Sequence, residues 1–94
     1  MSNQSIEIIE KKDNFRIELH PVGGFRFIFE NYVKGLSSKQ SAVEVLNKLN
    51  IEHTVLIDCS VCTVIRILSG KFKGDYDTNF DFDRGVFSLI QDRG

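Results

Sequence analysis

Three stretches near the start of the chain alternate apolar and polar residues: 5–10, 14–20 and 25–30. In the second stretch, Phe15, Ile17 and Leu19 fall on one side of an extended chain, which is typical of a half-buried β-strand. Residues 21–24 read Pro-Val-Gly-Gly, and the glycine pair permits the positive φ angles of a tight turn. We therefore predict a β-hairpin here. Residues 31–36 either extend its last strand or form a third, shorter one.

A helical pattern follows the hairpin. Ser37 and Gln40 have the spacing of a capping box, in which each side chain satisfies a backbone N–H at the start of a helix. From Ala42 to Leu49 apolar residues recur at spacings of three and four, and charged residues take the other side. These features predict a helix that begins at Ser37, ends near Asn50 and packs on the phenylalanine side of the hairpin.

The second half of the chain mixes strand and helix signals. Residues 53–58 are short, mostly apolar and β-branched, which suits a buried strand. Residues 60–69 have strand propensity, but Gly70 and the helical spacing of the apolar residues favour a helix. A polar loop is predicted over residues 70–85 and a last strand over residues 86–90. The predicted fold class is α+β, a small domain with the order ββ(β)αβαβ and two helices packed on an antiparallel or mixed sheet.

Size and charge narrow the class of protein. The chain has 94 residues, of which 41% are hydrophobic and 27% charged, and this indicates one globular domain over residues 1–94 with flexible ends at 1–4 and 91–94. A net charge of −1 argues against a uniformly basic nucleic-acid-binding surface. No apolar run approaches the ~20 residues that span a bilayer, and the first residues lack the pattern of a secretory signal. We therefore expect a cytoplasmic protein with no membrane partner.

Cys59 and Cys62 form a C-x-x-C pattern between a predicted strand and a predicted helix. This placement resembles that of thioredoxin-like redox proteins, in which the helix amino terminus lowers the pKa of the first thiol. Asp58 would oppose thiolate formation, and no proline follows to supply the cis-proline loop of that family. A thiol redox function is therefore our third hypothesis. Because the only histidines, His20 and His53, lie at unrelated spacings, we expect no metal. We also expect no cofactor.

A second pattern spans residues 62–71 and reads Cys-Thr-Val-Ile-Arg-Ile-Leu-Ser-Gly-Lys. It resembles the recognition helix of helix-turn-helix repressors and of the DNA-binding repeats attached to homing endonucleases, and with the upstream helix the resemblance covers residues 37–73. In those families the positions of Thr63 and Arg66 face the DNA groove, and a Gly-Lys pair ends the helix beside the phosphates. The resemblance implies nucleic-acid contacts from Thr63, Arg66 and Lys71. Lys73 joins these candidates because it clusters with Arg66 and Lys71 on one short basic stretch, and phosphate contacts need such cations.

A third pattern alternates aspartates with aromatic residues over residues 74–85. Its start matches an EF-hand loop, but Phe80 and Val86 occupy the positions that require glycine and glutamate, so we expect no calcium. The alternation instead predicts an edge strand or loop with its rings inward and its carboxylates outward. Such a row of carboxylates imitates phosphates or meets a basic groove on a protein partner. The candidate protein-binding residues are Asp75, Tyr76, Asp77, Asp81 and Asp83.

No catalytic constellation accompanies these patterns, because no serine or aspartate pattern lies near the histidines and no glycine-rich string matches a phosphate loop. The sequence therefore predicts a small non-enzymatic binding protein. Our first hypothesis is a DNA-associated regulator that contacts nucleic acid or a basic nucleic-acid-handling protein. The alternative is an anti-CRISPR-like inhibitor, of the kind encoded by phages and mobile elements, that docks its acidic segment on a basic protein surface. An exposed edge strand would also allow two copies to form a homodimer.

Overall fold

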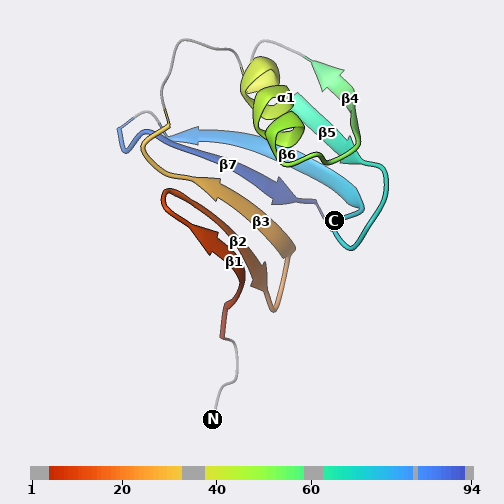
Figure 1. Cartoon of the computed structure of the whole chain (residues 1–94). Helices are drawn as coiled ribbons and strands as arrows, with labels where there is room; N and C mark the ends of the chain where they lie inside the picture. The colour runs from red at the N-terminus through yellow and green to blue at the C-terminus, as the bar shows by residue number, and fades with distance from the viewer. Residues whose placement is uncertain (1–4, 33–37, 59–62, 82, 93–94) are drawn as a thin grey trace.

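The structure is a computed structural model that describes residues 5–32, 38–58, 63–81 and 83–92. Within these ranges the chain forms one helix and seven strands (Figure 1). In chain order they are β1 (Glu7–Lys12), β2 (Phe15–His20), β3 (Gly24–Phe29), α1 (Ser38–Lys48), β4 (His53–Asp58), β5 (Thr63–Ile67), β6 (Gly74–Asp81) and β7 (Val86–Gln91).

All the strands belong to one antiparallel sheet with the order β1-β2-β3-β7-β6-β5-β4. The first three strands form a meander, after which the chain crosses to the far edge through α1 and returns as a second meander from β4 to β7. The last strand, β7, pairs with β3 and joins the two meanders. Consequently β1 and β4 are the edge strands, and β6 lies in the interior of the sheet.

The predicted hairpin is confirmed. β2 and β3 pair with Phe15 opposite Phe29 and Ile17 opposite Phe27, so the phenylalanine side is continuous across both strands. Gly23 in the connecting turn has a φ of 115°, which glycine adopts far more readily than other residues. The alternation of apolar residues and the turn chemistry therefore specify the same hairpin.

The predicted first helix is also present, as α1. It ends at a Schellman motif, because Asn50 has a φ of 58° and the Ile51 N–H donates to the Leu46 carbonyl oxygen at 3.0 Å. Its buried side packs against β4, β5 and β6 (Figure 1). Ser37, the predicted N-cap, lies outside the described residues. Within the described ranges, no helix is long and apolar enough to cross a bilayer.

The predicted helix over residues 60–69 is wrong, because Thr63–Ile67 form strand β5. β-Branched residues dominate this segment and favour extended backbone, and burial alternates along it, with Arg66 exposed between buried Ile65 and Ile67. The predicted loop over residues 70–85 is also wrong where Gly74–Asp81 form β6. The fold is therefore a mostly-β domain with a single short helix in its described part, and the predicted class of two helices on a sheet is not observed.

Aromatic rings fill much of the core between α1 and the sheet. Phe27 is fully buried, and its ring packs edge-on against Phe72 at 5.1 Å and Tyr76 at 5.5 Å between centroids. The Tyr76 hydroxyl donates to the Phe72 carbonyl oxygen at 2.7 Å, and burial raises the pKa of this hydroxyl. The turn that carries Phe72 therefore packs on β3 and β6 on the same face of the sheet as α1.

Candidate functional site

One face of the sheet packs against α1, and no described element covers the other, which we call the open face (Figure 1). Side chains alternate between the two faces along each strand. The register places one residue from every strand in a single row across the open face: Ile8, Glu18, Arg26, Ile90, Asp77, Val64 and Ile57. On β4 a bulge between Val55 and Ile57 turns Ile57 onto this face.

Asp77 occupies the interior of this row, on β6. Its cross-strand neighbours are Ile90 on β7 and Val64 on β5, and the Ile57 side chain beyond Val64 is 50% exposed. Asp77 is exposed, and no described residue forms a hydrogen bond or an ion pair with its carboxylate. The open face therefore combines an unneutralised carboxylate with aliphatic side chains on both sides of it.

The other carboxylates of β6 are engaged to different degrees. The Arg66 guanidinium donates from Nε and Nη2 to Asp75 at 2.8 and 3.3 Å, and this hydrogen bonding lowers the pKa of Asp75. Asp81 accepts a hydrogen bond from the Arg84 N–H at 3.2 Å, and the Arg84 Nε lies 4.0 Å from its carboxylate. Asp77 is therefore the carboxylate of β6 that is most available to a partner.

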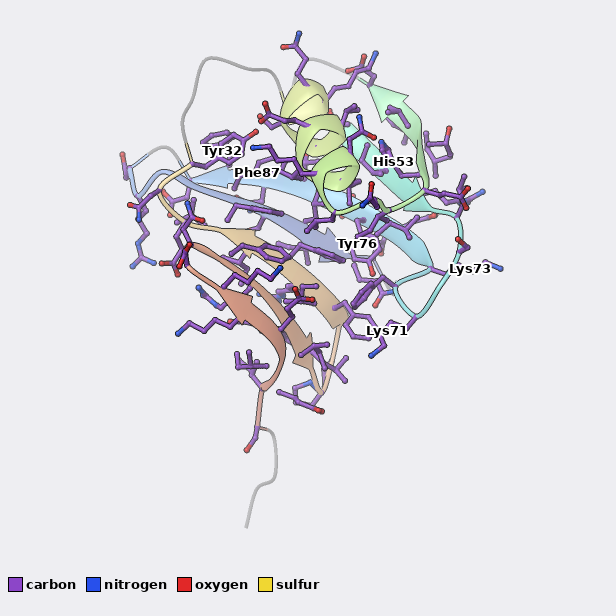
Figure 2. The ribbon with its side chains drawn as sticks, in the orientation of Figure 1. Tyr32, His53, Lys71, Lys73, Tyr76 and Phe87 are labelled. Carbon is purple, nitrogen blue, oxygen red and sulfur yellow. The ribbon has the colours of Figure 1, made fainter. Side chains whose placement is uncertain are left out.

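The alternation predicted for this segment is confirmed in β6, although the strand is interior and not an edge. Asp75, Asp77 and Asp81 lie on the open face, while Tyr76 is fully buried on the opposite face beneath α1 (Figure 2). Asp83 is exposed in the turn between β6 and β7, beyond the end of the strand. Two of the candidate residues thus lie apart from the row of carboxylates.

The four candidate nucleic-acid contacts do not form one surface. Thr63 is 2% exposed and lies on the α1 side of β5, whereas Arg66 lies on the open face and is paired with Asp75. Lys71 and Lys73 are exposed in the turn between β5 and β6, on one side of the molecule (Figure 2). This turn therefore carries the two candidate contacts whose charges are exposed and have no carboxylate partner among the described residues.

A charge network that the sequence patterns did not single out links the open face of β2 to Glu30, the residue after β3. Glu18 accepts hydrogen bonds from Arg16 at 2.6 Å and from His20 at 2.8 Å, and Arg16 also donates to Glu30. Burial alone would raise the pKa of Glu18, but the hydrogen bonds from Arg16 and His20 outweigh it and lower the pKa. Because the Glu18 and Glu30 carboxylates are both bonded to Arg16, this end of the open face offers them less readily to a partner.

Two grooves lie near the C-terminal end of α1. The larger, of about 620 Å³, separates β1 from residues 69–72, and the smaller, of about 470 Å³, includes His53. Two polar side chains of these grooves bond within the protein: Glu52 accepts from the Ser69 hydroxyl at 3.1 Å, and His53 Nδ1 donates to the Ile51 carbonyl oxygen at 2.9 Å. Over the described ranges, no three His, Cys, Asp or Glu side chains cluster in a way that would hold a metal ion.

The aliphatic neighbours of Asp77 were not among the predicted site residues. Ile57, Val64 and Ile90 come from three separate strands, so their proximity depends on strand order and register. The alternation within each strand was the available signal, but it does not say which strands are adjacent. Cys59 and Cys62, the candidate redox pair, lie outside the described residues.

Comparisons with known proteins are negative, since no family model, curated protein or solved structure matches this chain.

Proposed function

We propose that this protein is a non-enzymatic binding protein that docks the open face of its sheet on the basic surface of a protein partner. The observation that carries the proposal is the position of Asp77, an exposed and unneutralised carboxylate between the aliphatic side chains of Val64 and Ile90. Lysine and arginine combine an apolar stem with a charged end, so they match this arrangement of aliphatic surface and carboxylate.

Electrostatics supports a basic protein over a nucleic acid as the partner of this face. The carboxylates of Asp77 and Asp81 repel phosphates, while a basic surface gains both orientation and association rate from complementary charge. Of the residues predicted to contact nucleic acid, Thr63 is buried and Arg66 is paired with Asp75. We therefore place direct nucleic-acid binding, through Lys71 and Lys73, second.

The kind of partner follows from where basic protein surfaces occur. Proteins that bind nucleic acids carry basic patches, because neutralising phosphates and releasing counterions drives much of their affinity. A row of carboxylates that occupies such a patch competes with the nucleic acid for it. The protein would then act as an inhibitor or adaptor of a nucleic-acid-handling protein.

The test compares two charge reversals of the same kind. Asp77→Arg alters the centre of the open face, whereas Asp83→Arg alters an exposed aspartate in the β6–β7 turn and serves as the control. Partners captured by the wild-type chain and identified by mass spectrometry should include basic proteins that are lost with Asp77→Arg and kept with Asp83→Arg. The second function, direct nucleic-acid binding, would be favoured if the wild-type chain binds duplex DNA, if Lys71→Glu abolishes this binding and if Asp77→Arg leaves it unchanged.

A further inference from the structure

We infer that the element which docks on the open face is a cationic amphipathic helix of the partner, lying along β6. This inference rests on the proposed function, because it specifies the partner of the same face. It follows from three features of the described residues: the hydrogen bonding of β6, the spacing of its carboxylates and the aliphatic side chains beside them.

The hydrogen bonding of β6 restricts what can bind there. β5 pairs with residues 74–77 on one side of β6, and β7 pairs with residues 76–81 on the other, so the backbone at Asp77 has no free edge to which a further strand could add. An element that lies on the middle of this face must satisfy its own backbone groups, because buried N–H and C=O groups without partners are costly. A helix does so internally, and α1 already packs on the opposite face of β6 in this way.

The spacing of the carboxylates fits a helix. Asp77 and Asp81 are on the same face of one strand, and at about 3.4 Å per residue they are roughly 14 Å apart along β6. Two helical turns rise about 11 Å, so cations two turns apart fall opposite these carboxylates within the reach of lysine and arginine side chains. Between them Asn79 presents an amide that can bond to a polar residue one turn along the helix.

The width of the site fits a helix as well. Neighbouring strands lie about 4.8 Å apart, so a helix roughly 10 Å wide centred on β6 reaches β5 and β7. Val64 on one side and Ile90 on the other then contact apolar residues that flank the cations, and Ile57 extends the aliphatic surface toward the β4 edge. The partner helix therefore carries a cationic stripe between two aliphatic flanks.

Charge opposes one competing occupant. A second copy of the chain seated with its β6 on β6 would bring Asp77 and Asp81 close to the same carboxylates of its partner, and like charges at an interface are repulsive. The exposed helix surface of α1 offers no better match, since its exposed residues include Glu44 as well as Lys39 and Lys48. A helix of another protein, with a consistent positive stripe, satisfies the charge of the open face.

Two alanine-rich helical peptides test the inference by fluorescence anisotropy with the full chain. The phased peptide has two arginines two turns apart with leucines on both flanks, and the control peptide has the same composition with one arginine moved to the opposite side. We expect the phased peptide to bind at least about tenfold more tightly than the control. We also expect Asp77→Asn to remove most of that difference and Asp83→Asn to leave it unchanged, with both variants melting like the wild type.

The outcomes separate the two proposals. Equal binding of both peptides, with an equal loss of both on Asp77→Asn, would overturn the helix and leave the docking of a basic partner standing. If Asp77→Asn leaves the affinity for both peptides unchanged, both proposals are overturned, because the open face is then not the binding site. A third outcome is that neither peptide binds, although the chain captures a basic protein and Asp77→Arg abolishes that capture. This outcome would also overturn the proposal of a helical partner and leave the docking of a basic protein standing.

Discussion

Arg66 and Asp75 face each other across β5 and β6 and form an ion pair with two contacts, at 2.8 and 3.3 Å. In the sequence they belong to a basic stretch and an acidic stretch that follow one another. The antiparallel register folds these stretches side by side, so each removes one charge from the other. What remains on this face of β6 is Asp77 without a counterion, and the positive charges of Lys71 and Lys73 are left in the turn.

Replacing Arg66 should increase the affinity of the open face for a cationic peptide. Arg66→Gln frees Asp75, so we expect affinity for the phased arginine peptide to rise about two- to fivefold. The pKa of Asp75 should rise toward its ordinary value, because the hydrogen bonds that lower it are lost. NMR titration of the aspartate carboxyls measures the pKa of Asp75, and fluorescence anisotropy measures the affinity for the peptide. A lower affinity in Arg66→Gln than in the wild type would contradict the expected increase.

The Glu18 network should make stability depend on pH. The pKa of Glu18 is lowered by its partners below its ordinary value of 4.5, so the folded state binds the proton less readily than the unfolded state. The stabilisation is therefore complete above this value and is lost as the pH falls through the folded pKa.

Glu18→Gln should consequently cost about 1–2 kcal/mol at pH 7 and much less in strong acid. Urea unfolding of wild type and variant at pH 7 and at a pH well below the ordinary pKa of glutamate gives the comparison. A difference in the free energy of unfolding that is the same at both pH values would show that Glu18 acts through packing and not through its charge.

Phe27 should be among the most sensitive core positions. Its side chain is fully buried and packs against Phe72 and Tyr76, so Phe27→Ala should lower the free energy of unfolding by about 3–5 kcal/mol. Val22, which is 82% exposed in the β2–β3 turn, provides the control, and Val22→Ala should cost less than about 0.5 kcal/mol. Similar losses in both variants would contradict the assignment of the core.

Gly74 should not tolerate a side chain. Its φ of 144° strains any other residue, and an added Cβ would lie 2.7 Å from the Gln91 Nε2. Gln91 accepts a hydrogen bond from the Phe25 N–H at 3.0 Å, so displacing it disturbs a link between β7 and β3. We expect Gly74→Ala to cost about 1–3 kcal/mol in chemical unfolding. Gly70→Ala, which has a positive φ but nothing within 4 Å, should cost less, and the reverse order would refute the role of Gln91.

The first half of the fold was predictable because its signals are local. The alternation of Phe15 and Ile17, the glycine turn and the helical spacing after Ser37 depend on neighbours in the sequence. The secondary structure of residues 63–67 is ambiguous in the sequence, because the same apolar residues fit both helical spacing and strand propensity. Pairing with β4 and β6 stabilises this segment as a strand, and a single sequence does not show which strands pair.

For the candidate site, too, only the features that depend on local alternation were predictable. Alternation placed Asp77 outward and Tyr76 inward, and both positions agree with the structure. The pairing of Arg66 with Asp75 and the aliphatic neighbours of Asp77 depend on register, so they were not foreseen. Of the predicted nucleic-acid and protein contacts, Arg66 and Asp75 therefore form a neutralised pair, and Asp77 remains as a free carboxylate.

The most direct test of the central claim is an NMR map of the residues that respond to the phased arginine peptide. If the open face is the docking surface, the largest amide shifts should fall on β5, β6 and β7 around Val64, Asp77 and Ile90, and Asp77→Asn should greatly reduce them at the same peptide concentration. Shifts confined to the Lys71–Lys73 turn or to α1, and unchanged in the Asp77→Asn variant, would contradict the account.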